Sequence, residues 1–282
     1  MRLVRYGEPG QERPGLIDNT GKIRDLSGVV GDISGYILGN EKLASLLRLA
    51  PDNLPVVDQG VRLGPCVAGV GKIVGVAMNY KKHAAEMGDK QLPVEPILFL
   101  KATSSISGPY DEIVLPGGSE KTDWEVELGI VMGERAKNVS VSDALSCIAG
   151  YCVVNDVSER GFQFERGGTQ HSKGKSADTF CPIGPWLVTR DEIPDPQGLD
   201  LWTEVNGVRM QDSSTSDMIF NVAKLVSYIS EFMTLLPGDI IISGTPGGVG
   251  RGRKPQVFLK AGDVVALGVA GLGEQKHGVV QG

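Results

Sequence analysis

The longest predicted strand of this chain reads Trp124-Glu-Val-Glu-Leu-Gly-Ile-Val-Met132, an apolar run interrupted by two glutamates. Side chains two residues apart share one face of a strand. Glu125 and Glu127 therefore point to one side, and the apolar residues between them point to the other. Taken alone, this Glu-x-Glu pattern is more typical of a strand with one solvated face than of a functional site.

Short strands are also predicted on both sides of this run, separated by glycine and proline. The Asn206-Gly207 dipeptide is a strong signal for a tight hairpin. Regular alternation of strands and helices is missing, which argues against Rossmann and TIM folds. The sequence therefore predicts a mixed β-sheet domain with a few helices. The other strands are expected at residues 72–77, 97–100, 112–115, 150–155, 186–189, 201–205, 208–211, 237–243 and 261–267.

The first 65 residues are predicted to form a small separate module. It would hold a strand, a hairpin turning at Asn19-Thr20-Gly21 and a short amphipathic helix over residues 40–50. Prolines and glycines from Pro51 to Pro65 then break regular structure, so we expect domains at residues 1–65 and 66–282. Later helices are expected over residues 142–148 and 217–235.

Composition excludes several classes of protein. The 282 residues are 41% hydrophobic and 22% charged, which is ordinary globular usage and excludes a disordered chain. A net charge of −6 without a basic cluster argues against nucleic acid and anionic membranes as partners. No apolar run marks an export signal or a membrane span, so a cytoplasmic location is expected. In that compartment we expect reduced, mostly buried thiols at Cys66, Cys147, Cys152 and Cys181.

A third carboxylate changes the interpretation of Glu125 and Glu127. The apolar strand Tyr151-Cys-Val-Val-Asn155 is followed directly by Asp156. Three carboxylates with no cysteine or histidine would form an all-oxygen site. Such a site suits Mg²⁺, Mn²⁺ or Ca²⁺ and not Zn²⁺. The three residues are therefore candidate metal ligands.

A histidine and a glutamate lie three residues apart at His83 and Glu86, which makes them neighbours on a helix. A carboxylate beside an imidazole orients it and favours general-base chemistry. On spacing alone a surface ion pair is the more common arrangement. His171 lies in a glycine-rich loop with no carboxylate three or four residues away, and His277 lies in a C-terminal loop, so His83 is the better candidate for proton transfer. The segment 88–96, with two prolines, is a candidate hinge for this element.

Two glycine-rich stretches are also candidates. The spacing in Gly167–Ser176 does not fit a phosphate-binding P-loop, but Lys175 would be a cation on a glycine-flanked turn, or simply an exposed loop lysine. The stretch Ser243–Gly252 follows an apolar strand. It would aim backbone N–H groups and the Thr245 hydroxyl at an oxyanion, or form an ordinary glycine-rich turn.

The order of these motifs resembles the fumarylacetoacetate hydrolase family. The motifs are His-x-x-Glu, Glu-x-Glu, Asp-x-x-x-Arg-x-x-Gln at residues 156–163, Gly-Lys-Ser and Ser-Gly-Thr-Pro, and the resemblance runs from about Lys72 to the C-terminus. It implies an α+β, mainly β chain. A β-roll (mixed β-sandwich) catalytic domain would follow a small N-terminal α/β domain, usually in a homodimer. Residues 165–186 resemble a subgroup with 2,4-diketo-3-deoxy sugar acid hydrolases and proteins labelled ureidoglycolate lyase.

The resemblance also implies roles for individual residues. Mg²⁺ or Mn²⁺ would be bound by the three carboxylates, His83 with Glu86 would activate water on a mobile lid, and Lys175 would stabilise an enolate. The chain departs from the family pattern at Ala77-Met78, Lys82 and Ala102, which leaves the identity of the substrate open. The residues that fall where the family contacts substrate are Tyr80, Arg160, Gln163 and Thr245.

The expected reaction is hydrolytic C–C cleavage of a 2,4-diketo acid, an acylpyruvate or a 2,4-diketo-3-deoxy sugar acid. It gives pyruvate and a second acid through a metal-stabilised enolate. Three carboxylates and one divalent cation sum to −1, so an anionic substrate needs further positive charge, from Arg160, Lys175 and Lys101. The alternatives are a lyase (including ureidoglycolate lyase), decarboxylase or isomerase acting on a related keto acid. A protein in which the metal is only structural is a further alternative.

Overall fold

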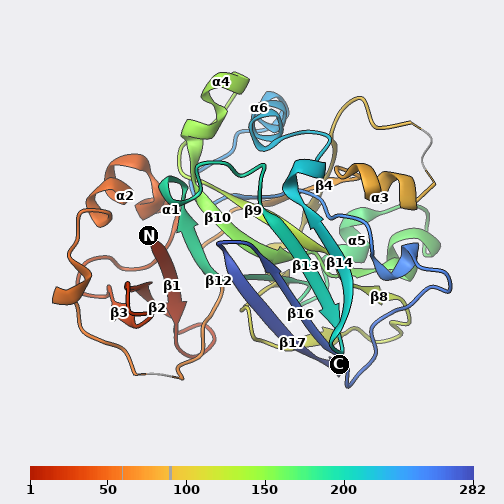
Figure 1. Cartoon of the computed structure of the whole chain (residues 1–282), viewed down its shortest axis with the longest axis horizontal. Helices are drawn as coiled ribbons and strands as arrows, with labels where there is room; N and C mark the ends of the chain where they lie inside the picture. Colours follow the sequence, from red (N-terminus) through yellow and green to blue (C-terminus); the bar gives the residue numbers. More distant parts are fainter. Residues whose placement is uncertain (59, 89–90) are drawn as a thin grey trace.

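The computed structural model describes residues 1–58, 60–88 and 91–282. Its largest element is a mixed sheet with the order β3-β2-β1-β12-β10-β9-β15-β4-β5, and β6 pairs with β12 beside this path (Figure 1). The strands are β1 (Arg2–Tyr6), β2 (Arg13–Ile17), β3 (Ile23–Asp25), β4 (Ile73–Ala77), β5 (Ile97–Lys101), β6 (Ile106–Ser107), β9 (Val126–Met132), β10 (Ile148–Asn155), β12 (Cys181–Thr189) and β15 (Ile240–Ile242).

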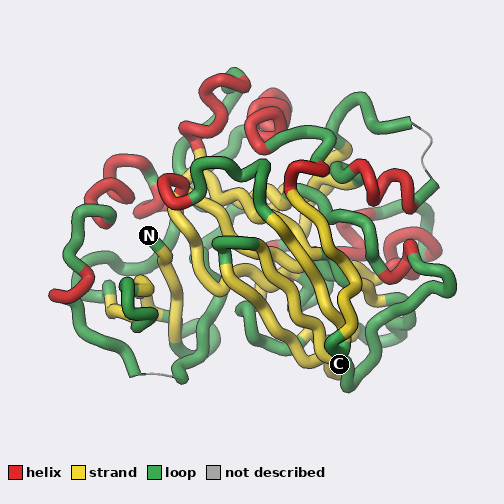
Figure 2. Tube along the Cα trace, in the orientation of Figure 1, coloured by secondary structure: helices red, strands yellow, loops and turns green. Residues whose placement is uncertain are grey.

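A second sheet packs against β9 and β10 of the first, with the order β14-β13-β16-β17-β7. The two sheets enclose the main core, and helical segments lie around the outside of the strands (Figure 2). The prediction of an α+β, mainly β chain with mixed sheets is confirmed. The remaining strands are β7 (Ile113–Leu115), β13 (Asp200–Val205), β14 (Val208–Ser214), β16 (Val264–Val269) and β17 (Gly273–Gln281), with β8 (Thr122–Asp123) and β11 (Ser158–Glu159) as a separate pair.

The helices are short, and several differ from their predicted bounds. The helix expected over residues 217–235 begins only at Val222, because the Asn221 side chain caps it by accepting from the Lys224 amide at 2.9 Å. The helix expected over residues 40–50 ends at Leu46. The helices are α1 (Gly35–Leu38), α2 (Asn40–Leu46), α3 (Lys81–Glu86), α4 (Val141–Ala144), α5 (His171–Lys175) and α6 (Val222–Phe232).

Strand β9 is buried along its whole length, between β10 and β15 within the sheet and against the second sheet across it. Its apolar face packs on the second sheet, and the glutamates on the other face are also buried, with Glu125 5% and Glu127 1% exposed. The alternative of a strand with one solvated face is wrong for this stretch. Buried carboxylates are costly unless charge or hydrogen bonds compensate them, so Glu125 and Glu127 need partners.

The N-terminal segment adds strands to the large sheet. Strand β1 pairs antiparallel with β12, and Leu3 lies opposite Leu187. Both side chains are fully buried in one core cluster, which also contains Ile73 and Ile240 from the later part of the chain. The boundary at residue 65 stays a prediction, but the two parts share a sheet and a core.

Strand β17 was not predicted from the sequence, because two of its three buried positions are polar. Gln275 and His277 are buried where a typical strand would place apolar side chains. Gln275 compensates by donating to the backbone carbonyls of Val153, Pro182 and Gly184 at 3.0–3.2 Å. Hydrophobic alternation, the usual signal for a strand, is therefore weak here.

The four cysteines are buried with free thiols, as expected. Within the described residues, no helix has both the length and the apolar character that a membrane crossing requires. The segment proposed as a hinge, residues 88–96, includes residues 89 and 90, which lie outside the described part of the chain.

Candidate metal centre and active site

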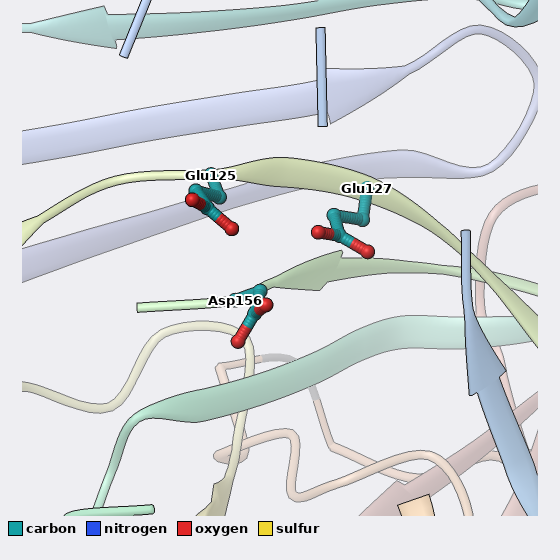
Figure 3. Close-up of side chains that lie close together, drawn as sticks. All are labelled: Glu125, Glu127 and Asp156. Carbon is teal, nitrogen blue, oxygen red and sulfur yellow. The ribbon is translucent and has the colours of Figure 1, made fainter. Parts of the chain in front are cut away.

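Three carboxylates meet where β9 begins and β10 ends. Because these strands are antiparallel neighbours, with Val126 opposite Asn155, Glu125 comes to lie beside Asp156. The Asp156 amide donates to the Glu125 carbonyl at 2.9 Å. Oxygen atoms of Glu125, Glu127 and Asp156 lie within 4.8 Å of one another; Glu127 is on β9, Glu125 directly precedes β9, and Asp156 directly follows β10 (Figure 3).

Two of the three carboxylates have cationic partners. Lys175 Nζ bridges Glu125, at 2.7 Å, and Asp156, and it also donates to the Ser158 hydroxyl. Arg160 donates to Glu125, and Lys101 donates to Asp156. Burial raises the pKa of Glu125, but the charges of Lys175 and Arg160 outweigh it and hold that pKa well below its ordinary value.

Glu127 has no such partner among the described residues. Its carboxylate accepts one hydrogen bond, from the Gly244 amide at 2.7 Å, and it is almost completely buried. Burial raises the pKa of Glu127 well above its ordinary value, and the charges of Asp156 and Glu125 raise it further. A buried carboxylate that lacks a cation, next to two others, fits a divalent metal with oxygen ligands.

His83 and Glu86 lie on helix α3, beside the carboxylate cluster. His83 Nδ1 is 3.3 Å from Glu86 Oε2, and His83 is only 7% exposed. A surface ion pair is therefore the wrong description of this pair. The Gly248 amide donates to both oxygens of Glu86, at 3.0 and 3.1 Å. Glu86 is thus held in place while it faces the imidazole.

The glycine-rich loop from Ser243 to Gly252 contacts carboxylates of the protein itself. Its amides donate to Glu127 from Gly244, to Glu86 from Gly248, and to Asp123 from Gly250 and Arg251. The expectation that these N–H groups face a substrate oxyanion is therefore wrong for these four amides. The loop instead supports the site from one side.

These groups share one cavity of about 310 Å³. That volume is near the lower end of the range of about 300–1,000 Å³ for small-molecule sites, so it suits a small polar ligand. The structure brings most of the predicted residues together here. The predicted residues that line the cavity are His83, Glu125, Glu127, Asp156, Arg160, Gln163, Lys175 and Thr245.

The other predicted residues lie outside the cavity lining. Lys101 donates to Asp156 and is almost fully buried. Tyr80 is completely buried, and its hydroxyl has no hydrogen-bond partner among the described residues. Glu86 contacts the site through His83. Lys175, which does line the cavity, belongs to helix α5 and is buried, so it is not an exposed loop lysine. The roles assigned to all of these residues stay predictions.

Two polar residues of the cavity lining were not found from the sequence. His171 has no carboxylate at helical spacing, yet its ring stacks on Phe99 and its Nδ1 lies 2.9 Å from Gln163 Nε2. Arg251 is embedded in glycines, and its side chain nevertheless reaches the cavity. A charged residue inside a glycine-rich loop was the available signal for Arg251.

Comparisons with known proteins agree with this geometry. The sequence pattern of the family described as "Fumarylacetoacetate (FAA) hydrolase C-terminal" matches residues 72–280. A relative from Burkholderia cenocepacia, provisionally named a hydrolase without a substrate, is 58% identical over 276 residues, which cover 98% of this chain and 97% of the relative.

Solved structures are similar over the whole chain. A fumarylacetoacetate hydrolase from Exiguobacterium antarcticum is 34% identical with a TM-score of 0.86, and each chain is covered completely. A maleylpyruvate hydrolase from Sphingobium sp. SYK-6, in complex with manganese(II) and pyruvate, is 30% identical with a TM-score of 0.83 and complete coverage of both chains. A 2-hydroxyhepta-2,4-diene-1,7-dioate isomerase from Mycobacterium marinum is 34% identical with a TM-score of 0.76, covering 100% of this chain and 98% of that one.

The sequence and the fold of this chain thus match those of the relatives over nearly its full length. The chain belongs to the fumarylacetoacetate hydrolase family.

Proposed function

We propose that this protein is a metal-dependent hydrolase that cleaves the C–C bond of a 2,4-diketo acid and releases pyruvate. The observation that carries the proposal is one cavity lined both by the three buried carboxylates and by His83, which is paired with Glu86. The similar maleylpyruvate hydrolase, solved with manganese(II) and pyruvate, supports the same type of reaction.

Glu125, Glu127 and Asp156 would hold Mg²⁺ or Mn²⁺. When bound, the metal supplies a Lewis acid that stabilises negative charge on the oxygen atoms of the substrate. Glu127 is the ligand whose charge is otherwise uncompensated in this cluster, so it gains most from the cation.

His83 is the proposed general base. Its Nδ1 faces Glu86, which leaves Nε2 to take a proton from water. The hydroxide so formed adds to the 4-oxo carbon, and the C3–C4 bond breaks. The electron pair of that bond becomes the enolate of pyruvate, which is then protonated at C3, while the acyl part leaves as the second acid.

Lys175 and Arg160 are the proposed cations for the substrate and for the enolate. Both line the cavity and both already contact Glu125. The neighbouring carboxylates outweigh the effect of burial and raise the pKa of Lys175, so its ammonium group stays charged. A fixed cation that faces developing negative charge lowers the activation free energy.

The test uses protein stripped of metal with a chelator and then supplied with Mg²⁺ or Mn²⁺. Acylpyruvates and 2,4-diketo-3-deoxy sugar acids are supplied, and pyruvate is measured. We expect pyruvate release that requires the metal and that Glu127→Gln abolishes. Metal binding without pyruvate from any substrate would overturn the proposal.

An isomerase is the second candidate, because a neighbour of comparable identity has that activity in its name. In that case ultraviolet absorbance of a dienoate substrate would change while no pyruvate appears. We also propose a homodimer, which light scattering on the purified protein would test.

A further inference from the structure

A second hollow, of about 410 Å³, lies beside the active-site cavity and shares Met87 and Arg251 with its lining. Three of the residues that line it are the cations Arg251, Arg253 and Lys254, which fall within four consecutive positions of the chain. Among the described residues, the one carboxylate in the lining is Glu86, which leaves a formal charge of +2. The chain as a whole has a net charge of −6, so this surface, here termed the cationic hollow, is a local exception.

The cations of the hollow are not compensated by carboxylates within the described residues. Glu86 is already engaged, because it accepts from the Gly248 amide at 3.0 and 3.1 Å and faces His83. Arg253 donates from Nη2 to the Met210 carbonyl at 3.1 Å, and its Nε is buried without a hydrogen-bond partner in the described part of the chain. A buried N–H group without an acceptor costs free energy, so Arg253 gains from any ligand that accepts from it.

The backbone that carries these cations is held by hydrogen bonds of the protein itself. The Arg251 amide donates to Asp123 at 3.0 Å, and the Val257 amide donates to the Gly250 carbonyl at 3.1 Å. Gln256 Nε2 donates to the Arg251 carbonyl at 3.0 Å. The hollow is therefore formed in advance, which lowers the entropy cost of ordering it around a ligand.

We infer that the cationic hollow binds a phosphate dianion, either free or as the phosphate group of a small metabolite. A dianion matches the formal charge of +2, whereas a carboxylate would neutralise only half of it. A guanidinium has five N–H donors, so Arg253 can bind two phosphate oxygens and still keep its bond to Met210. Lys254, which is exposed, would add a point charge at the rim.

The hollow is next to the proposed active site but separate from its metal centre. Gly252 packs so closely on Glu86 that a Cβ atom there would lie 2.2 Å from the Glu86 Cδ atom. The three candidate metal ligands and Lys175 line the cavity and not the hollow. A phosphate in the hollow would thus contact the loop beside Glu86, and its binding does not require the proposed reaction.

The test is calorimetric titration with inorganic phosphate at constant ionic strength, with chloride as the balancing anion. For the wild type we expect saturable binding of one phosphate per chain. Arg253→Met should weaken binding about 10–100-fold, the range for loss of a charge-assisted hydrogen-bonded pair. Lys254→Met should weaken it about 2–5-fold, because solvent screens an exposed charge.

Lys260→Met is the matched control. Lys260 is an exposed lysine a few residues further along the chain, and it lines neither the cavity nor the hollow. This variant removes the same charge from the protein and should bind phosphate with the Kd of the wild type. Circular dichroism checks the folding of each variant, and Lys254→Met, which changes only an exposed side chain, tests the inference if Arg253→Met does not fold.

Repeating the titration after removal of metal with a chelator separates this inference from the proposed function. Phosphate held by the hollow should keep its Kd, whereas phosphate bound to the metal should lose affinity. Glycerol 3-phosphate, a phosphate monoester, is the second probe. Tighter binding than free phosphate would identify a phosphorylated metabolite as the ligand, and weaker binding would identify phosphate itself.

The inference is overturned if the wild type shows no saturable binding up to about 10 mM phosphate. It is also overturned if the folded hollow variants bind phosphate with the Kd of the wild type, or if binding disappears when the metal is removed. None of these results depends on pyruvate release, so the proposed reaction can fail while the phosphate site is confirmed, and the reverse.

Discussion

The backbone amide of Gly248 donates to both carboxylate oxygens of Glu86, although the two residues are 162 positions apart in the sequence. The loop that supports Glu127 through Gly244 thus also holds the partner of the proposed general base. Gly248 has a φ of +104°, and a Cβ atom there would lie 2.1 Å from the carbonyl oxygen of Met210. Only glycine fits this position without moving the loop.

Gly248→Ala should therefore lower kcat, because the loop must shift and the amide then leaves Glu86. We expect a loss of about 10–100-fold from the weakened orientation of His83, with metal affinity retained. Gly262→Ala is the control, since Gly262 has a similar φ of +95° and an added Cβ meets no atom within 4 Å. Steady-state kinetics and metal titration on both variants decide the matter. Equal effects of the two substitutions would contradict a specific role of the loop.

His83→Ala should lower kcat by about 10²–10⁴-fold, the usual contribution of a positioned general base. Metal binding should persist, because the three carboxylates remain. The exposed neighbour Lys82 provides the control variant Lys82→Ala, for which we expect wild-type kinetics. An unchanged kcat in His83→Ala would show that another group takes the proton.

Glu127→Gln should abolish the effect of the metal on stability. In the wild type we expect Mg²⁺ or Mn²⁺ to raise Tm and a chelator to lower it, since a ligand that binds only the folded state stabilises that state. The amide keeps the shape of the side chain but provides no charge for the cation, so the Tm of the variant should not respond. Thermal unfolding with and without metal measures this, and a variant that still responds would exclude Glu127 as a ligand.

Leu3→Ala should destabilise the whole chain by about 2–5 kcal/mol, because Leu3 is fully buried opposite Leu187. Urea unfolding followed by circular dichroism, which reports the strands and helices of both parts of the chain, should show one transition, shifted to lower urea. Leu47→Ala, at a position 39% exposed, should cost much less. Two separate transitions would instead indicate that residues 1–65 fold as an independent module.

Much of the candidate site could be predicted from spacing along single strands and helices. Glu125 and Glu127 share a strand face by two-residue periodicity, and His83 and Glu86 are neighbours on one helical turn. Asp156 was also identified, as the residue that follows an apolar strand. These inferences needed only local geometry, which the chain carries in its sequence.

Residues positioned by contacts between distant segments were harder to predict. Tyr80 and Lys101 were expected to contact substrate, but neither lines the cavity. Strand β17 was missed because Gln275 and His277 are polar residues buried by neighbours that the sequence does not display. His171 was set aside for lack of a nearby carboxylate, yet its relevant neighbours are Phe99 and Gln163.

The sequence by itself determined the class of fold, the order of the motifs and the three candidate metal ligands, because each depends on local periodicity and residue chemistry. Only the tertiary structure decided which charges are compensated. It paired Lys175 with Glu125 and Asp156, and it left Glu127 and Arg251 without an ionic partner among the described residues. The physical reason is that electrostatic compensation depends on distance and burial between segments far apart in the chain, and neither quantity is contained in local sequence.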